Sequence, residues 1–287
     1  MISVLVLTKN EERDLPGCLA SVAWSDDIHV FDSGSTDGTP DVARALHAHV
    51  TQRVTDEAKG VFGGDEAAHR NWGLRNIAFR HPWVLLLDAD ERATPALAAN
   101  LKRAAEAPQG HVAFEVQRRD FLDRTWLKHV QATPYYLRLF QPNRLHYERL
   151  INPVSVADGP VGKVAGYIDH YPFSKGLSHW LKRHNDYSTL EAMQIAANRQ
   201  AAAPVNVWKA FFGHDFSERR AQQKELFYRA PARPLIKFLL LYVLKRGFLD
   251  GRAGLTYAVL QSMYEYMIVL KTDELRNARR LGEARSV

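Results

Sequence analysis

Short apolar runs alternate with helical segments over the first hundred residues, and this alternation limits the possible folds more than any other feature of the chain. The predicted strands cover residues 2–8, 28–32, about 49–54 and 83–88. Asp14 is the expected N-cap of one helix, with Pro16 in its first turn, and Thr39 is the expected N-cap of the next, with Pro40 at its first position. Further helices are expected from about residue 65 and from Thr94 and Pro95. Buried apolar strands that alternate with amphipathic helices are typical of a mostly parallel sheet covered on both faces. The pattern therefore predicts a Rossmann-like α/β fold.

Acidic residues follow two strands of this predicted sheet. Asp32 ends the second strand within FDSGSTDGT, and Asp88 and Asp90 end the later strand within WVLLLDADERAT. Ligands of such sheets bind beyond the carboxyl ends of the strands. Each cluster alone is also typical of a polar turn before a helix. The two clusters together favour a binding site, because closely spaced carboxylates repel one another unless a cation or protonation relieves them.

The residue types in these clusters suit a nucleotide diphosphate. Asp88 and Asp90 alternate along an extended chain, so one can hold a divalent cation directly and the other directly or through water. Magnesium or manganese takes one or two carboxylates and completes its shell with water and phosphate oxygens. Asp32 can accept hydrogen bonds from a base or ribose, and residues 33–35 allow the backbone to approach closely. The sequence predicts a nucleotide-diphosphate pocket with Mn²⁺ or Mg²⁺ as cofactor.

Four motifs carry a resemblance to a known family: VLVLTKNEERDLPGCLASV, VFDSGSTDGT, HRNWGLRN and WVLLLDADE. In this order and spacing they resemble the family 2 glycosyltransferases of the GT-A fold, above all the bacterial members that add sugars to lipopolysaccharide core or other cell-surface glycans. The resemblance is strong over about residues 2–100, and residues 158–189 also resemble the second half of that subgroup. It implies a GT-A fold, a nucleotide-sugar donor that we expect to be a UDP-sugar, and inversion at the anomeric carbon.

The resemblance also implies roles for individual residues. Those expected to contact the nucleotide sugar are Thr8, Asn10, Glu11, Asp32, Ser33, Ser35, Arg70, Asn71, Asp88, Ala89 and Asp90. Among them, Asp88 and Asp90 match the metal-binding pair, and Asp32 matches the aspartate that contacts the uracil or ribose. A further carboxylate would deprotonate the acceptor hydroxyl while the metal stabilises the departing diphosphate.

This catalytic base is expected about sixty residues after the aspartate pair, in RLHYERLINP. Glu148 is the candidate there, with Asp158 and Asp120 as alternatives. Many relatives carry a His-Glu pair a few residues after the Arg-Leu step, where this chain has Asn152 and Pro153. Glu148 could equally be a solvated loop acid, so the choice between the three carboxylates stays open.

The length of 287 residues suits one α/β core and an appended region. We expect a GT-A catalytic domain over residues 1–175, with a nucleotide-sugar-binding half at 1–100 and an acceptor half at 101–175. Residues 176–287 are expected to form a helical, membrane-associated region.

The positive charge gathers within this second region. Residues 217–252 hold nine Lys or Arg and three acids, an excess equal to the net charge of +6. The apolar run that begins at Pro234 is interrupted by Lys237 and Lys245, so it is shorter than the ~20 residues that a spanning helix needs. Basic residues among Phe, Leu and Tyr suit a helix that lies in the lipid interface, with Phe238, Leu239 and Leu241 buried there. The alternative is that these helices pack on the catalytic domain or on a partner subunit.

Location and partners follow from these features. Cys18 is the only cysteine, which excludes an internal disulfide and fits a reducing compartment, and Met1 leads directly into the first strand rather than into a signal. We expect a cytoplasmic protein, peripherally associated with the cytoplasmic face of the inner membrane. Its expected partners are a nucleotide-sugar donor, a glycan or glycolipid acceptor and an anionic membrane surface, without nucleic acid; a homo-oligomer stays open.

Three other functions deserve weighing. A haloacid-dehalogenase phosphatase also ends a strand with paired aspartates, but it needs Thr or Val where this chain has Arg92. A nucleotidyltransferase would show a glycine-rich loop after the first strand, and TKNEERD is none. A non-catalytic binding module would require that the base be absent. His170, His179 and His184 are expected to be polar or acceptor-contacting residues, because 179 and 184 miss the i, i+4 spacing of a helical zinc pair.

Overall fold

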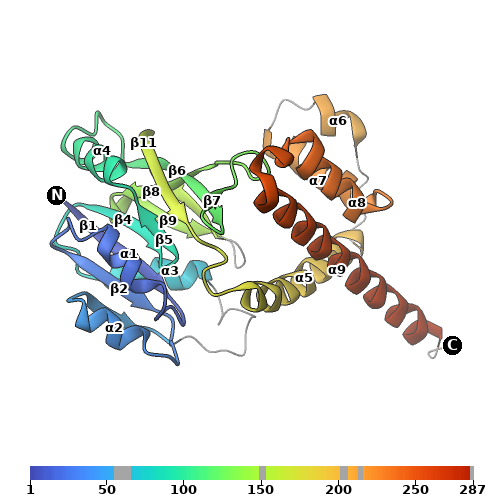
Figure 1. Cartoon of the computed structure of the whole chain (residues 1–287), viewed down its shortest axis with the longest axis horizontal. Coiled ribbons are helices and arrows are strands. Elements are labelled where there is room, and N and C mark those ends of the chain that lie inside the picture. The colour runs from blue at the N-terminus through green and yellow to red at the C-terminus, as the bar shows by residue number, and fades with distance from the viewer. Residues whose placement is uncertain (55–65, 149–152, 201–205, 213–215, 285–287) are drawn as a thin grey trace. The chain divides into compact units, whose positions relative to one another are not determined.

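The computed structural model describes residues 1–54, 66–148, 153–200, 206–212 and 216–284. The chain divides into two compact units (Figure 1). Unit 1 comprises Met1–Trp126 and Ala132–Lys175, and unit 2 comprises Leu127–Gln131 and Gly176–Val287.

Within the described residues, unit 1 is built on a nine-stranded sheet with the order β3-β2-β1-β4-β8-β6-β11-β5, in which β7 pairs with β6 off this path. Its strands are β1 Ile2–Thr8, β2 Ile28–Asp32, β3 His49–Gln52, β4 Trp83–Asp88, β5 Glu91–Ala93, β6 Ala113–Leu122, β7 Thr125–Trp126, β8 Tyr135–Phe140 and β11 Val161–His170. The first four strands of the order are parallel to one another, whereas β8 runs antiparallel to both β4 and β6. A separate antiparallel hairpin joins β9 Leu145–Glu148 to β10 Val154–Ala157.

Helices cover both faces of this sheet. They are α1 Leu15–Ser21, α2 Thr39–Ala45, α3 Glu66–Asn76 and α4 Pro95–Glu106, with a short 3₁₀ helix, η2 Pro142–Arg144. Alternate residues of β4 face opposite layers: Leu85 and Leu87 pack with residues of α1 and α4, whereas Val84 and Leu86 pack with residues of α3. Each fully buried leucine contributes about 1.5–3 kcal/mol relative to an exposed one. This arrangement confirms the predicted α/β fold class.

The predicted helix starts hold in part. Thr94 is the N-cap of α4, and its side chain accepts a hydrogen bond from the Leu97 amide. The prediction that Thr39 caps α2 is wrong: Gly38 is the N-cap, and the Thr39 hydroxyl instead donates to the Asp37 carboxylate. Asp14 is at the N-cap of α1 without capping it through its side chain.

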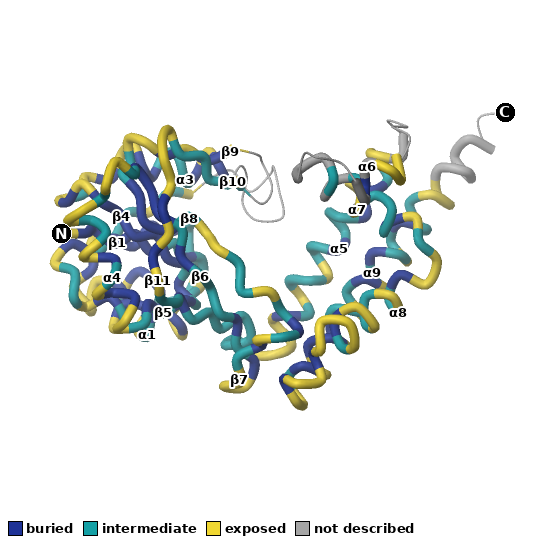
Figure 2. The backbone as a smooth tube through the Cα atoms, turned by 90° about the horizontal axis from the view of Figure 1, so that it is seen from above, coloured by how far each residue is buried: buried dark blue, intermediate teal, exposed yellow. Residues whose placement is uncertain are grey.

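Unit 2 is helical in its described part. Its elements are α5 Leu177–Gln200, α6 Val207–Phe212, α7 Phe216–Arg229, α8 Arg233–Phe238, the π-helix η3 Leu239–Leu244, the 3₁₀ helix η4 Gly247–Asp250 and α9 Gly251–Ala284. The long helix α9 contacts α5, α8 and η4 (Figures 1 and 2). None of the helices searched in the described residues combines the length and the hydropathy needed to span a membrane.

Buried polar contacts fasten the parts of unit 2 together. The Arg233 guanidinium of α8 forms an ion pair with Glu265 of α9, and both side chains are almost fully buried. Lys271 of α9 donates to the Asn185 carbonyl and to the Ser188 hydroxyl of α5. Because a buried charge without a partner is costly, these pairs specify how the three helices pack.

Candidate active site

Three parallel strands bring the predicted acidic residues to one edge of the sheet. In the register of β1 with its neighbours, Thr8 pairs with Asp32 of β2, and Leu7 pairs with Asp88 of β4. The carboxyl ends of β2, β1 and β4 therefore lie side by side. This edge is where open α/β sheets bind ligands.

Asp32 is buried and organises the turn that follows β2. Its carboxylate accepts hydrogen bonds from five donors: Thr8 Oγ1 at 2.9 Å, Ser35 Oγ, the Gly34 and Ser35 amides at 3.1 and 2.9 Å, and Gln52 Nε2 at 3.2 Å. Burial opposes ionisation, but these hydrogen bonds outweigh it and lower the pKa of Asp32. Two carboxylate oxygens offer about four acceptor positions. A base or ribose can therefore donate to Asp32 only if it replaces one of these donors. Gln52, which makes the longest of the five bonds, is the first candidate for replacement.

An aromatic wall lies beside Asp32. The Phe31 ring stacks on His69 with centroids 4.1 Å apart, and on Trp72 at 5.7 Å. Burial and the neighbouring Arg53 lower the pKa of His69 to about 4, so the imidazole is neutral at pH 7, and its Nε2 lies 2.9 Å from Ser33 Oγ. Phe31 is fully buried and His69 is 7% exposed, so these stacked rings support the turn that carries Asp32, and Trp72 is the partly exposed ring of the three.

The loop after β1 is joined to the turn after β2. Asn10 has a left-handed backbone, and its side-chain oxygen accepts a hydrogen bond from the Thr36 amide at 2.7 Å. Its own amide donates to Ser35 Oγ at 2.8 Å. These bonds hold the two predicted nucleotide-binding loops as one rigid group.

Glu11 in the same loop pairs with a lysine from the end of unit 1. Lys175 Nζ donates to the Glu11 carboxylate and to the Asn10 carbonyl, the latter at 2.7 Å. Burial raises the pKa of Glu11 to about 7 although Lys175 acts in the opposite direction. The segment after β11 thus places a cation at the carboxyl edge of the sheet, close to the predicted diphosphate position.

Asp88 is surrounded by arginines. Arg138 Nη2 lies 3.3 Å from Asp88 Oδ2 and 2.6 Å from Oε1 of the fully buried Glu91. Burial opposes the charge of Asp88, but Arg138 and Arg70 outweigh it and lower its pKa to about 2. The carboxylate is therefore ionised at physiological pH, with part of its charge already neutralised by the protein.

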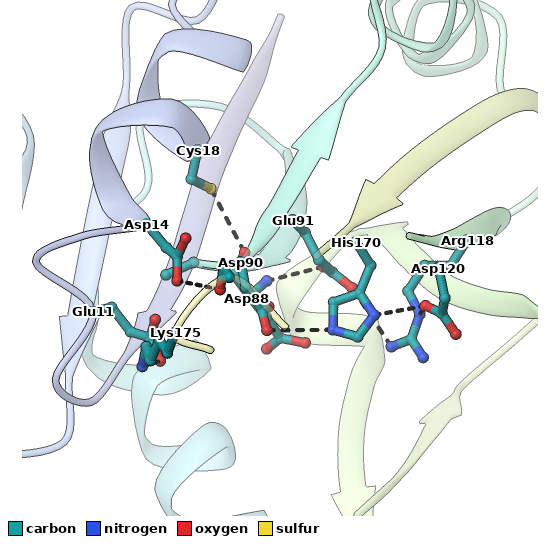
Figure 3. A network of polar contacts seen from close by, with 12 residues as sticks. Glu11, Asp14, Cys18, Asp88, Asp90, Glu91, Arg118, Asp120, His170 and Lys175 are labelled. Carbon is teal, nitrogen blue, oxygen red and sulfur yellow. Dashed lines mark hydrogen bonds and ion pairs between the residues drawn. The ribbon is translucent and has the colours of Figure 1, made fainter. Parts of the chain in front are cut away.

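Asp90 belongs to a second network, which Figure 3 shows from close by. His170 Nε2 lies 3.3 Å from Asp90 Oδ2, and His170 Nδ1 lies 2.6 Å from Asp120 Oδ1. Asp120 also pairs with Arg118 Nε at 3.1 Å. Burial opposes protonation of His170, but the two aspartates outweigh it and raise its pKa to about 9. The imidazole connects the predicted metal-binding aspartate with one of the predicted alternatives for the base.

The donors at this edge fit a divalent cation that takes few protein ligands. Cation–oxygen bonds of about 2.1 Å place neighbouring octahedral ligands about 3 Å apart, close to the separation of Asp90 from His170. The described residues contain no group of three His, Cys, Asp or Glu side chains arranged to hold a metal. The remaining positions would fall to water and diphosphate oxygens, as magnesium and manganese prefer, and His170 would ligate only after losing its proton.

Glu148, the predicted base, follows Tyr147, whose side chain is buried beside Arg70. Asn71 is bonded to both backbone groups of Tyr147, at 2.7 and 2.8 Å, and Arg70 lies 5.4 Å from the Tyr147 ring. The Glu148 side chain alternates to the other face of β9, is 60% exposed and lies 3.1 Å from His146 Nε2. Asn152, where relatives carry part of a His-Glu pair, lies outside the described residues.

Asp158 lies at the other end of the sheet. It follows β10, and its carboxylate pairs with Arg144 at 3.2 Å. Arg144 belongs to the turn after β8, where Phe140 pairs with Val84 near the beginning of β4. The structure therefore brings Asp120 to Asp90 through His170, whereas the Glu148 and Asp158 carboxylates pair with His146 and Arg144.

Sequence reasoning missed several members of these networks. Arg138 and Lys175 were not predicted, and neither was the ion pair of Glu91 with Arg138, because these contacts join segments that are far apart in sequence. His170 was considered as a polar residue, and its place beside Asp90 follows from the pairing of β11 with β6 and β5. The signal that could have identified these residues is the register of the paired strands, which the sequence does not reveal.

Comparisons with known proteins find similarity over most of unit 1. The model of glycosyl transferase family 2 matches residues 3–167. The lipopolysaccharide core biosynthesis glycosyltransferase LpsC of Rhizobium meliloti is 25% identical over 276 residues, which cover 94% of this chain and 91% of that protein.

Solved structures are similar over different shares of the chain. Glucosyl-3-phosphoglycerate synthase of Mycobacterium tuberculosis, solved with Mn²⁺ and UDP-glucose, is 25% identical over 42% of this chain and 44% of its own, with a TM-score of 0.34. TarS of S. aureus is 15% identical over 92% of this chain and 90% of its own, with a TM-score of 0.40. Because the family model matches more than half of the residues, the chain belongs to glycosyl transferase family 2.

Proposed function

We propose that this glycosyltransferase moves a sugar from a UDP-sugar to a lipopolysaccharide-core or lipid-linked glycan, with inversion at the anomeric carbon and with help from Mn²⁺ or Mg²⁺. The observation that carries the proposal is the gathering of Asp32, Asp88 and Asp90 at one sheet edge beside His170. The name of the relative LpsC supports the choice of acceptor. Such an acceptor also fits a peripheral position on the cytoplasmic face of the inner membrane.

The proposed roles follow from the contacts. Asp32 would accept a hydrogen bond from the base or the ribose in place of its long bond from Gln52. Asp90 and Asp88 would hold the cation, with His170 as a further ligand once it has lost its proton, and the cation would supply positive charge against the departing diphosphate. Lys175 would add a cation on the side of the β1 loop.

Sugar transfer also needs a base that takes the proton of the acceptor hydroxyl. Glu148 would take the proton of the acceptor hydroxyl as its oxygen forms a bond to the anomeric carbon. The bond from that carbon to the diphosphate breaks on the opposite side, so the configuration inverts and UDP leaves. Asp120 is less suited to the role, because Arg118 and His170 already pair with its carboxylate.

Titration calorimetry with UDP tests the proposed donor site. Binding should require Mn²⁺ or Mg²⁺ and should disappear with chelator, and Asp90→Ala should weaken it at least ~10-fold, about 1.4 kcal/mol. Asp158→Ala is the matched control, since its carboxylate lies at the other end of the sheet. Equal UDP affinity with and without metal would contradict metal assistance.

A further inference from the structure

The segment from α8 to η4 exposes an unusual number of large apolar side chains. Leu235, Leu239, Val243, Leu244, Phe248 and Leu249 have relative exposures from 47% at Leu239 to 75% at Leu244. They fall within 15 consecutive residues, and we call residues 235–249 the apolar face (Figure 2). Single exposed apolar residues are common on proteins, but a contiguous group marks a surface that binds something.

The apolar face is held in place at both ends. Before it, Arg233 forms its buried ion pair with Glu265 of α9. After it, the buried Asp250 accepts hydrogen bonds from the His129 and Val130 amides at 2.9 and 2.8 Å. Leu241 is buried inside unit 2, which corrects the expectation that it faces lipid. The exposure therefore belongs to a fixed surface of unit 2 and not to a frayed chain end.

Charge indicates what covers this surface. Lys245 and Arg246 are exposed within this segment, and Arg252 is exposed three residues after its end. The chain has two carboxylates between residues 233 and 265, Asp250 and Glu265, and both are buried against partners within unit 2. The exposed part of this stretch thus combines apolar and cationic side chains and presents no carboxylate, which complements a surface of acyl chains below anionic headgroups.

We propose that the apolar face docks on an anionic lipid membrane, with Leu244, Phe248 and Leu249 among the acyl chains and with Lys245, Arg246 and Arg252 against headgroup phosphates. Long basic side chains can lay their methylene stems along the apolar layer while their charges reach the phosphates. A second copy of the chain fits less well, because a two-fold interface would bring these cations toward one another without an exposed carboxylate between them. The inference goes beyond sugar transfer, since lipid binding needs neither donor nor acceptor.

Vesicle co-sedimentation of the full chain tests the proposal. The protein should bind vesicles of phosphatidylcholine mixed with phosphatidylglycerol more tightly than vesicles of phosphatidylcholine alone, and high salt should release it. Leu244→Asp with Leu249→Asp should lower the partition coefficient at least ~10-fold. The matched control is Leu177→Asp with Met193→Asp, which changes two residues of α5 with 51% and 54% exposure and should leave binding unchanged.

Charge reversal separates the two parts of the surface. Lys245→Glu with Arg246→Glu should abolish the preference for phosphatidylglycerol and most of the salt dependence. Equal vesicle binding by the Leu244 and Leu249 variant and its control would overturn the proposal. A second outcome would also overturn it: light scattering shows that the parent protein is a dimer and the Leu244 and Leu249 variant a monomer, and the parent protein does not bind vesicles. UDP affinity, measured on the same samples, shows separately whether the donor site is correct.

Discussion

The sheet of unit 1 carries charged side chains at both of its ends, and the two ends use them differently. At the end where β1 and β4 begin, Asp27 is buried between the Ser3 hydroxyl, the Arg80 amide at 2.8 Å and His29 at 3.0 Å. Burial opposes ionisation there, but these hydrogen bonds lower the pKa of Asp27. Its partners belong to neighbouring strands and to the turn before β4, so this carboxylate stabilises the packing of these elements.

At the carboxyl end, four carboxylates lie close together although the strands could pair without them. Asp90 and Asp120 meet through His170, and Asp88 and Glu91 meet through Arg138. Interleaved cations offset the repulsion of four acids. The comparison teaches that a buried acid is not by itself a sign of chemistry: the position at the carboxyl edge, with carboxylates gathered from several strands, distinguishes the candidate site.

The largest expected difference between the two ends is in sugar transfer. Glu148→Gln should lower the rate about 10²-fold or more, the usual size of a general-base contribution, and should leave UDP affinity unchanged. Asp158→Asn, at the other end of the sheet, should retain the parent rate. The measurement is release of UDP with a glycan acceptor. A normal rate for Glu148→Gln with a large loss for Asp120→Asn would move the role to the carboxylate beside His170.

A change at the amino end should act on stability instead. Asp27→Ala leaves the Ser3 hydroxyl and the Arg80 amide without their acceptor, which costs about 1–3 kcal/mol for each buried group. UDP affinity should stay as in the parent. Because the folded pKa is lowered, Asp27 stabilises the fold above its unfolded pKa, and this contribution should disappear as the pH falls through the folded value.

Urea unfolding at neutral and acidic pH measures this effect. The gap in unfolding free energy between parent and Asp27→Ala should narrow toward acid. A constant gap would show that packing around residue 27, rather than its charge, is responsible. If Asp27→Ala is still folded but no longer binds UDP, the claim that the amino end serves stability and the carboxyl end serves binding would be contradicted.

Much of this arrangement could be predicted because it is local in sequence. Strand runs that end in Asp32 and Asp88 predict both the sheet and the edge where the acids meet, and the motifs around them indicated the family that the match over residues 3–167 confirms. That match also removes the phosphatase and nucleotidyltransferase alternatives. Glu91 shows the limit: the sequence placed it beside the aspartates, but its complete burial against Arg138 depends on β8, about fifty residues later.

The pairing order of the last strands could not be predicted. β11 inserts between β6 and β5, which brings His170 to Asp120 and Asp90. No local pattern encodes that choice, because it is made by packing among segments that are distant in the chain. The apolar face of unit 2 shows the same limit, since the run of apolar residues was visible but which of its members point outward was not: Leu239 is exposed and Leu241 is buried.

The smallest effect is expected from a comparison of two lysines near opposite ends of β11. Lys175 follows the strand and lies at the carboxyl edge, where its ammonium donates to the Asn10 carbonyl and pairs with Glu11. Lys163 is near the beginning of the strand and lies 4.0 Å from Glu115 with 63% exposure. If the diphosphate binds beside the β1 loop, Lys175→Met removes a cation from it and should weaken UDP binding about 10-fold, or 1.4 kcal/mol, whereas Lys163→Met should leave it unchanged.

Salt provides the second arm of this measurement. Attraction between an ammonium and a diphosphate is screened by ions, so the affinity gap between the parent protein and Lys175→Met should shrink as the salt concentration rises. A gap that stays constant with salt would mean that Lys175 acts by holding Glu11 and Asn10 in place rather than by its charge. Glu11→Gln separates these two cases further, because it removes the carboxylate that pairs with Lys175. If the Lys175 ammonium binds the diphosphate, this change should tighten UDP binding; if Lys175 only holds the loop in place, it should not.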